Sequence, residues 1–386
     1  MTRPLRIAQV APPMERVPPA AYGGTERIVH ELVVELDRRG HEVTTFASGD
    51  SEVPGRHVTT VPRALRPAGF TDDPMGWFLN TALAVLDRQD EFDVIHSHLE
   101  WPSLVLARGA HVPVVATFHG RLDLPWSRPI LASPTTASLV AISRAQAAPH
   151  PDVDWTVIHN GLTLATAPFD RRRSEALCFV GRVAPEKGIV DAIDIARLSG
   201  RPLKIAAKVA PAGRERDYYE NVFQPALRKA GSLVEFLGEL SGDQRDRLFA
   251  ESDAALMPGM WPEPFGLTAI EALACGTPVL ARPVGGLPEI IRDGVDGFFG
   301  HDVHELAFHV PDVASLDRSE IRASVLERFS ARRMTDGYES LFRRIVAADT
   351  ERDATADGVR AGEGRVVAMA SLKSGNGPPA APTKAG

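Results

Sequence analysis

Apolar residues in this chain gather in short runs that alternate with longer segments of helical period. Residues 5–11 (LRIAQVA) form the first run, and such a continuous apolar stretch is typical of a buried strand. Residues 25–40 (TERIVHELVVELDRRG) place apolar side chains on one helical face and end at Gly40, a common helix stop. Residues 41–48 (HEVTTFAS) predict the next strand, so the chain opens as strand, helix and strand.

The same alternation continues through two long stretches, which are separated by a polar, proline-led segment at residues 168–175. Strands that alternate with helices pair in parallel and connect through right-handed crossovers. We therefore predict an α/β fold with two Rossmann-like, doubly wound parallel-sheet domains that face a cleft. The further predicted strands are residues 93–98, 113–120, 138–143 and 155–161 before the linker, and 176–183, 203–209, 233–238, 254–259 and 278–285 after it.

These patterns place an N-terminal domain at residues 1–168 and a C-terminal domain at residues 169–328. Residues 329–348 carry the pattern of a final amphipathic helix. Residues 350–386 turn rich in Gly, Ala, Pro and charged side chains, and we expect this tail to be disordered.

Composition and charge narrow the classes of partner. The 386 residues suit two domains, and the net charge of −7 gives no general attraction to nucleic acid, which we do not expect as a partner. The two cysteines, Cys178 and Cys275, predict no disulfide framework and fit a reducing compartment. No apolar stretch reaches about 18 residues and no signal-peptide pattern opens the chain. We expect a cytoplasmic protein without an integral membrane segment, and no pattern specifies an oligomeric state.

The stretch EPFGLTAIE, residues 263–271, is the first candidate for chemistry. Glu263 and Glu271 lie eight positions apart, and Pro264 biases the residue before it toward an extended backbone. A helix is predicted to begin near Phe265–Gly266, and the free N–H groups of its first turn form a site for anions or sugar hydroxyls. The alternative is a pair of solvated acids, one on a loop and one on a helix.

Two further segments combine helix starts with cations or glycines. Arg182 and Lys187 in FVGRVAPEKG precede a predicted helix, where they would clamp a diphosphate or lie in a solvated turn. Gly23 and Gly24 precede the first helix, where the lack of side chains permits close approach of a phosphate or sugar. A flexible entry turn is the alternative for these two glycines.

Three histidines and two aspartates complete the candidates. His119 ends a predicted strand, where it would bond a substrate hydroxyl or act as a cap. His96, His98 and Glu100 suggest a metal site, with the two histidines on one face of a strand, but no other ligand cluster supports zinc. Asp152 and Asp154 have the spacing of a metal-binding acidic pair, and we interpret them as a solvated loop. We therefore predict no metal site and no cofactor.

Taken together and in order, these segments resemble the family 4 retaining glycosyltransferases, which have the GT-B fold. The most specific match is EPFGLTAIEALACGTPVLARPVGGLPEII, residues 263–291, in which Glu263 and Glu271 have the E-x7-E spacing. VGRVAPEKG, YGGTER, VIHNGL and ATFHG match the same family in the same order, and the resemblance covers about residues 5–348.

The resemblance implies roles for the matching residues. Glu271 would bind the ribose of the donor nucleotide, and Glu263 would hold hydroxyls of the transferred sugar. Backbone N–H groups of Phe265, Gly266 and Leu267 would contact the sugar and phosphate.

The remaining implied roles involve both domains. Arg182 and Lys187 would neutralise the diphosphate leaving group, which Gly23 and Gly24 would contact from the other domain. His119 would contact the sugar near its C6 hydroxyl. The base would lie against the loop around Leu237 to Leu240, and the helix from Phe329 would cross back to the N-terminal domain.

The family implies a retaining hexosyltransferase that needs no metal and takes a nucleotide-sugar donor and an unidentified hydroxyl acceptor. UDP-glucose is favoured as donor on family frequency alone. Retaining hydrolases use a carboxylate nucleophile, but none stands out here, so we expect a front-face mechanism. The alternatives are a GT-B-fold sugar-nucleotide epimerase and a non-catalytic sugar-nucleotide-binding protein. A nicotinamide oxidoreductase is disfavoured because the first strand and helix lack the G-x-G-x-x-G pattern.

The chain also departs from the common family pattern. His159 stands where the VIHNGL motif usually has proline, and Thr163 stands where an acid often follows. For that reason we assign no catalytic role to Asn160. The long loop at residues 11–24 lies where the acceptor should bind, and we expect it to shape acceptor choice.

Overall fold

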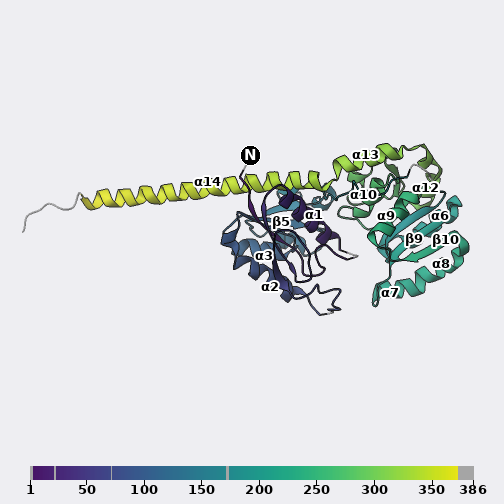
Figure 1. Ribbon diagram of the computed structural model, residues 1–386, viewed down its shortest axis with the longest axis horizontal. Helices are drawn as coiled ribbons and strands as arrows, with labels where there is room; N and C mark the ends of the chain where they lie inside the picture. The colour runs from purple at the N-terminus through teal and green to yellow at the C-terminus, as the bar shows by residue number, and fades with distance from the viewer. Residues whose placement is uncertain (1–2, 21–22, 71, 171–173, 373–386) are drawn as a thin grey trace, which may run out of the picture. The chain divides into compact units, whose positions relative to one another are not determined.

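The computed structural model describes residues 3–20, 23–70, 72–170 and 174–372. The chain divides into a body that ends at Glu339 and a second unit that begins at Ser340. Two all-parallel sheets form the body, and helices pack around each of them (Figure 1). The predicted α/β class with two doubly wound sheets is therefore confirmed. Part of the predicted linker at 168–175, residues 171–173, lies outside the described residues.

The first sheet has the strand order β3-β2-β1-β4-β5-β6-β7. We call residues up to Ala167, which carry this sheet, the N-terminal half. The strands are β1 (Arg6–Val10), β2 (Glu42–Ser48), β3 (Arg56–Val61), β4 (Val94–Ser97), β5 (Val114–Phe118), β6 (Ser138–Ala141) and β7 (Trp155–Val157). The helices are α1 (Gly24–Arg38), α2 (Met75–Leu86), α3 (Pro102–Gly109), α4 (Ser127–Leu131) and α5 (Arg144–Ala147).

The second sheet has the order β10-β9-β8-β11-β12-β13. Residues 174–328, which carry it, are called the C-terminal half. The strands are β8 (Leu177–Arg182), β9 (Leu203–Lys208), β10 (Val234–Gly238), β11 (Ala255–Met257), β12 (Val279–Ala281) and β13 (Gly297–Phe299). The helices are α6 (Ile189–Ser199), α7 (Arg214–Tyr218), α8 (Gln224–Ala230), α9 (Gly242–Glu251), α10 (Leu267–Ala274), α11 (Leu287–Ile290), α12 (Val303–Phe308) and α13 (Arg318–Arg328).

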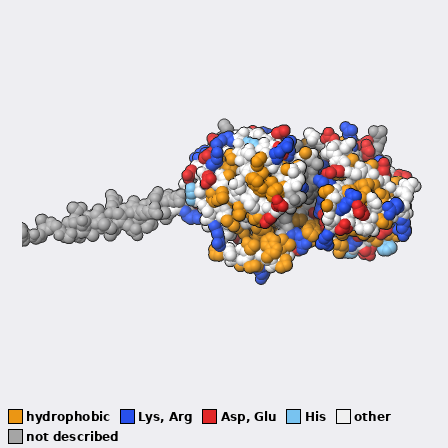
Figure 2. All heavy atoms as spheres, turned by 90° about the horizontal axis from the view of Figure 1, so that it is seen from below, with side chains coloured by type: hydrophobic (Ala, Val, Ile, Leu, Met, Phe, Trp, Pro, Cys, Tyr) orange, Lys and Arg blue, Asp and Glu red, His pale blue; other side chains and the backbone are white. Residues whose placement is uncertain are grey.

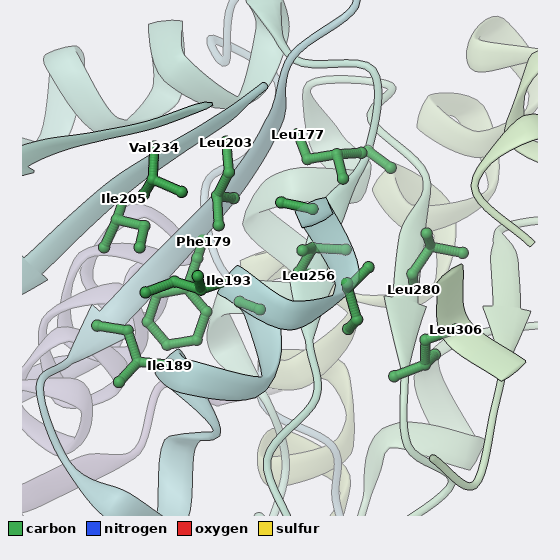
Figure 3. Close-up of a cluster of buried hydrophobic side chains, with 14 of the residues drawn as sticks. Leu177, Phe179, Ile189, Ile193, Leu203, Ile205, Val234, Leu256, Leu280 and Leu306 are labelled. Carbon is green, nitrogen blue, oxygen red and sulfur yellow. The ribbon is translucent and has the colours of Figure 1, made fainter. Parts of the chain in front are cut away.

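The apolar runs of the sequence become buried strands because helices cover both sheet faces. In the second sheet, side chains of β8 and β9 pack against one face of α6 (Figure 3). Helix α1 follows the same rule: Ile28, Val29, Leu32, Val33 and Leu36 are buried on one face. Between β8, β9 and α6, Figure 3 shows Leu177, Phe179, Ile189, Ile193, Leu203 and Ile205.

The strand orders fix where a ligand can bind. Each sheet reverses its winding direction at one point, between β1 and β4 in the first sheet and between β8 and β11 in the second. Open α/β sheets bind ligands at the carboxyl ends of the strands beside such a point. The loops after β1, β4, β8 and β11 are therefore the segments where a site is expected.

Two strands have no counterpart in the sequence prediction. Strand β3 has the sequence RHVTTV and lies at the sheet edge, where its outer face is polar. Strand β13 is only three residues long, GFF, and starts at Gly297. Short or half-exposed edge strands lack the continuous apolar run that marks a buried strand, so the pattern search misses them.

Helix α14 (Ala331–Leu372) begins within the body and continues into the second unit. Its first turns contact the N-terminal half: the Gly161 N–H donates to Met334 Sδ at 3.2 Å, and Tyr338 Oη lies 3.1 Å from Thr117 Oγ1. The crossing that the resemblance implied is therefore present in residues 331–339.

The expected disordered tail differs from the structure as far as Leu372. The helix continues through residues 350–372, where alanine, arginine and glutamate favour a helix and no proline interrupts it. Residues 373–386 lie outside the described part of the chain.

Two surface properties bear on partners. None of the helices in the described ranges is both long and apolar enough to cross a membrane. On the face drawn in Figure 2, acidic and basic side chains are intermingled over the body.

Candidate functional site

A cavity of about 520 Å³ lies between the carboxyl ends of the two sheets. Its wall contains residues of the loops after β1, β5, β8 and β11, together with the first turn of α10. Eleven of the twelve predicted site residues line it. They are Gly23, Gly24, His119, Arg182, Lys187, Leu240, Glu263, Phe265, Gly266, Leu267 and Glu271.

The start of helix α10 supplies the backbone part of the site. Gly266 caps the helix with φ 121°, and a Cβ atom there would lie 2.8 Å from Leu287 Cδ2. Only glycine fits this turn without strain. The turn brings the first backbone N–H groups of α10 to the cavity wall, where they favour an anion or a hydroxyl oxygen.

Glu271 is a buried acid held by two arginines. Its side chain is 5% exposed, and its Oε1 accepts from Arg27 Nη1 at 2.5 Å and lies 2.9 Å from Arg245 Nη2. Arg27 comes from α1 in the N-terminal half, whereas Arg245 comes from α9 in the C-terminal half. Glu271, the residue predicted to bind the ribose, therefore lies where the two halves meet.

The two predicted diphosphate cations are also paired with acids. Lys187 Nζ donates to Glu263 Oε1, so one candidate holds another directly. Arg182 donates to Glu215 and, at 2.9 Å, to Oε1 of Glu186. All five side chains are part-buried, so these ion pairs lie at the boundary with solvent. A diphosphate that enters the cavity can take over the two cations.

His119 is fixed at the end of β5 by an acid that the sequence analysis did not use. Glu100 Oε1 accepts from the backbone N–H groups of His119 at 2.9 Å and of Gly120 at 3.1 Å. Burial raises the pKa of Glu100 to about 7, although these two hydrogen bonds oppose the shift. Burial also lowers the pKa of His119 to about 3, so its imidazole is neutral at pH 7.

The cavity wall also contains charged residues that the sequence did not predict, among them Glu26, Arg27, Glu100 and Arg245. Glu26 and Arg27 are part of YGGTER, where attention fell on the glycines. Glu100 was considered only as a metal ligand. Arg245 lies on an ordinary amphipathic helix, and nothing in its local sequence separates it from other surface arginines.

One predicted base-binding residue is placed elsewhere. Leu237 lies within β10 and does not line the cavity, whereas Glu239 and Leu240 do. Gly238, with φ 72°, turns the chain between them and ends the strand. The cavity wall in this segment therefore begins one residue after the turn.

The segments set aside as non-functional can also be located. Asp152 and Asp154 are exposed in the turn before β7, and both cysteines are buried and unbridged. His96 and His98 lie on one face, with ring centroids 4.1 Å apart. Within the ranges that the structure covers, no three His, Cys, Asp or Glu side chains are grouped so that they could hold a metal ion.

His159, the departure from the family pattern, connects the two halves. Its Nε2 lies 2.9 Å from Oε2 of Glu289, which also accepts from the backbone N–H groups of Arg144 and Ala145. Although burial opposes it, the hydrogen bond from His159 and those from the two N–H groups lower the pKa of Glu289. The histidine replaces a rigid proline with a polar contact between the halves.

Comparison with known families assigns both halves. Residues 169–317 match the model described as "Glycosyl transferases group 1". Residues 22–166 match the model described as "Glycosyltransferase Family 4". The two matches meet close to the segment that joins the sheets.

Curated relatives and solved structures agree with these matches. The chain is 29% identical to a glycogen synthase of Mycobacterium tuberculosis over 331 residues, covering 72% of this chain and 79% of the relative. It is 33% identical to a D-inositol 3-phosphate glycosyltransferase of Mycobacterium marinum over 227 residues, covering 54% and 48%.

Among solved structures, AviGT4, a glycosyltransferase involved in avilamycin A biosynthesis, has a TM-score of 0.66 and 26% identity, covering 89% of this chain and 99% of its own. A sucrose-phosphate synthase from Thermosynechococcus elongatus has a TM-score of 0.69 at 20% identity, covering 89% of this chain and 100% of its own, which is a likeness of fold.

Proposed function

The chain belongs to the family 4 glycosyltransferases of the GT-B fold, and from that membership we propose a retaining transfer of a hexosyl group from a nucleotide-diphosphate sugar to an acceptor hydroxyl. One observation carries the proposal. A single cavity collects two cations, a helix N-terminus and two carboxylates from the C-terminal half, with His119 and two glycines from the N-terminal half. This set matches the parts of a nucleotide sugar one by one.

Arg182, Lys187 and the first turn of α10 bind the diphosphate in this proposal. Negative charge develops on that diphosphate as the bond to the sugar breaks, and fixed positive groups stabilise the charge where it forms. Both cations already point at the cavity because acids hold them there. Donor binding exchanges Glu263 for phosphate oxygens at Lys187, which frees the Glu263 carboxylate for the sugar hydroxyls.

The sugar and the ribose are bound by carboxylates. Glu271 accepts hydrogen bonds from the ribose hydroxyls, and its buried position in the middle of α10 keeps it at the cavity wall. Glu263 precedes Pro264, and its carbonyl accepts from the Gly286 N–H at 2.7 Å, which fixes the loop. The two carboxylates then hold neighbouring parts of one donor and do not form an acid–base pair.

The proposed reaction proceeds on one face of the sugar. The bond between the anomeric carbon and the diphosphate oxygen breaks, and the diphosphate keeps the electron pair. The acceptor oxygen forms its bond to the anomeric carbon from the same side. Its proton passes to the departing phosphate oxygen, so the anomeric configuration is retained. Lys187 and Arg182 lower the barrier because they stabilise the developing charge.

We propose UDP-glucose as the donor and metal-independent transfer as the mode of catalysis. The first rests on its frequency in the family, and the second on the two cations and helix terminus that neutralise a diphosphate. The acceptor enters from the N-terminal half, where Met14, Arg66 and Phe78 line the cavity beyond the predicted site residues. This wall includes part of the long loop after β1.

A panel of sugar nucleotides tests the proposal. Purified protein is incubated with UDP-, GDP- and ADP-linked hexoses in chelator, and release of nucleoside diphosphate is measured. Release with one or more donors, lost in the Lys187→Ala variant, supports the transferase. Conversion of the donor into a different sugar nucleotide without release identifies an epimerase. Thermal stabilisation without any turnover identifies a binding protein, and stabilisation by NAD alone contradicts the proposal.

A further inference from the structure

A row of buried polar side chains crosses the carboxyl edge of the first sheet. Gln9 lies on β1, His98 directly follows β4, and His119 directly follows β5. These strands are neighbours in the sheet, in the order β1-β4-β5. Gln9 and His98 are fully buried, while His119 reaches the cavity wall. The row therefore runs from the sheet interior to the site.

Two hydrogen-bond contacts join the row. His98 Nε2 lies 3.2 Å from Gln9 Oε1, and His98 Nδ1 lies 2.9 Å from His119 Nε2. The two imidazole rings are nearly parallel, with an interplanar angle of 27°. Both nitrogens of His98 and one nitrogen of His119 are thus assigned to partners within the protein.

The orientation of the Gln9 amide assigns the proton on each ring. Its Oε1 faces His98, and an amide oxygen only accepts, so in this orientation His98 Nε2 carries a hydrogen and donates it to Gln9. Burial lowers the pKa of His98 well below its ordinary value, so the ring is neutral and holds one proton only. Its Nδ1 is then an acceptor, and the Nε2–H of His119 donates to it. Neutral His119 keeps a lone pair on Nδ1, the one ring nitrogen left for a ligand.

We propose that Gln9 and His98 are positioning residues that hold His119 as its Nε2–H tautomer, so that His119 Nδ1 accepts a hydrogen bond from a hydroxyl of the transferred sugar. This inference rests on the proposed glycosyltransferase function and specifies its donor class. A lone pair at this position favours a sugar with a free hydroxyl. If this hydroxyl is the one on C6, as the family resemblance implies, the same lone pair repels the C6 carboxylate of a hexuronic acid.

The backbone of His119 is held separately from its ring. The Glu100 side chain accepts a hydrogen bond from the His119 backbone N–H, not from the imidazole. His96 packs on His98, with ring centroids 4.1 Å apart, and its Nε2 lies 2.8 Å from Thr117 Oγ1. It therefore serves as the matched control: a buried histidine of the same strand whose Nε2 faces Thr117 rather than Gln9 or His119.

The tautomer can be measured on the ligand-free protein. Long-range proton–nitrogen NMR of the full chain labelled with ¹⁵N-histidine distinguishes protonated from unprotonated ring nitrogens, and the His119→Asn variant assigns the signals. We expect His119 to be protonated at Nε2 and unprotonated at Nδ1 from pH 6 to pH 8. Protonation at Nδ1, the result of the opposite Gln9 amide orientation, would overturn the inference whether or not the protein is an active transferase.

Variants then test the consequence for specificity. In Gln9→Glu, a carboxylate faces His98 and favours a second proton on its ring, so His98 donates to His119 and reverses the His119 tautomer. We expect kcat/KM for the hexose donor to fall at least about tenfold and the preference for hexose over hexuronate to narrow by a similar factor. His96→Gln should leave the tautomer and this donor ratio unchanged.

A second variant keeps the test open if a buried glutamate prevents folding. Gln9→Met removes the acceptor without adding charge, and we expect a mixed His119 tautomer with a smaller loss of donor preference. An unchanged His119 tautomer in every folded Gln9 variant, or a changed tautomer with an unchanged donor ratio, would overturn the proposed role.

Discussion

The two edges that form the cavity use different chemistry. The C-terminal half contributes ion pairs: Lys187 with Glu263, Arg182 with Glu186 and Glu215, and Lys208 with Glu239. The N-terminal half contributes Arg27 and Arg66, which pair with Glu271 and Glu15, but at the strand ends it relies on hydrogen bonds between buried groups. The imidazoles of His98 and His119 bond each other there, and Glu100 holds the His119 backbone. The strand ends of the C-terminal half are therefore held mainly by ion pairs, and those of the N-terminal half mainly by buried hydrogen bonds.

This difference predicts different behaviour on donor binding: the ion pairs of the C-terminal edge can exchange partners, whereas the buried hydrogen bonds of the N-terminal edge are formed before the donor binds. An ion pair that keeps solvent contact contributes roughly 0–1 kcal/mol, so a diphosphate can displace its acid at small cost. A buried hydrogen bond that loses its partner costs about 1–3 kcal/mol. We therefore expect the C-terminal edge to rearrange when the donor binds, and the N-terminal edge to keep its geometry.

The largest expected effect comes from removing one of the two cations of the C-terminal edge. Lys187→Ala and Arg182→Ala each lose a positive charge at the leaving group, and we expect kcat to fall about 100- to 1000-fold. Steady-state kinetics with a saturating donor measures it. Arg216→Ala is the control, because Arg216 is exposed and pairs with Glu220 on the neighbouring turn. Near wild-type turnover in either site variant would remove the diphosphate clamp from the mechanism.

Variants of Glu263 and Glu271 should differ in which kinetic parameter they change, the donor KM or kcat. Glu271→Gln keeps the shape of the side chain but weakens the ribose contact, so we expect the donor KM to rise about tenfold with little change in kcat. Glu263→Gln should reduce kcat as well, since the proposed role of Glu263 is to hold the reacting sugar. Initial rates over a range of donor concentrations separate the parameters. Equal losses in both parameters for both variants would contradict the division of roles.

The fold could be predicted because its signals are local and repeated. Buried parallel strands require runs of apolar residues, and this pattern predicted eleven of the thirteen strands found in the described residues. Strand β3 at the edge and the three-residue β13 do not, because one needs few buried side chains and the other is too short to show a period. The site segments were found for a related reason: glycines and helix starts mark the same sheet edge.

What the sequence could not supply is the pairing across the cavity. Arg27 and Glu271 are 244 positions apart and come into contact only after both halves have folded. Gln9, His98 and His119 lie on three separate segments, and their order follows from strand order, which a single sequence does not display. Local patterns identify the candidates, whereas tertiary structure decides which of them share a proton or a charge.

Glu26, a buried acid of the N-terminal half, should make the stability of the protein depend on pH. Burial raises the pKa of Glu26 from 4.5 to about 7, and repulsion by Glu15 adds to it. The stabilising effect of the neutral form is complete below pH 4.5 and is lost as the pH rises through 7. Relative to Glu26→Gln, wild type should lose about 3 kcal/mol of unfolding free energy between pH 4.5 and pH 7.5. Urea unfolding across this range measures the difference.

Helix α1 offers a control of opposite sign. Hydrogen bonds from Arg38 and Arg39 lower the pKa of Glu35, although burial opposes them. Its contribution is therefore present above pH 4.5 and lost as the pH falls, so Glu35→Gln should be costly at pH 7 and nearly neutral in acid. Parallel pH trends for the Glu26 and Glu35 variants would show that neither trend arises from these groups.

The contact between Arg27 and Glu271 joins the two edges, and its effect should be the smallest. Arg245 remains as a second partner of Glu271, so removing Arg27 leaves the buried carboxylate paired. We expect a double-mutant cycle of Arg27→Met and Glu271→Gln to give a coupling of about 1 kcal/mol in ligand-free protein. With saturating nucleoside diphosphate the coupling should fall toward zero, because the ribose takes over Glu271. A coupling that persists in the complex would mean that Glu271 stays with Arg27, and the ribose role would then belong to another residue.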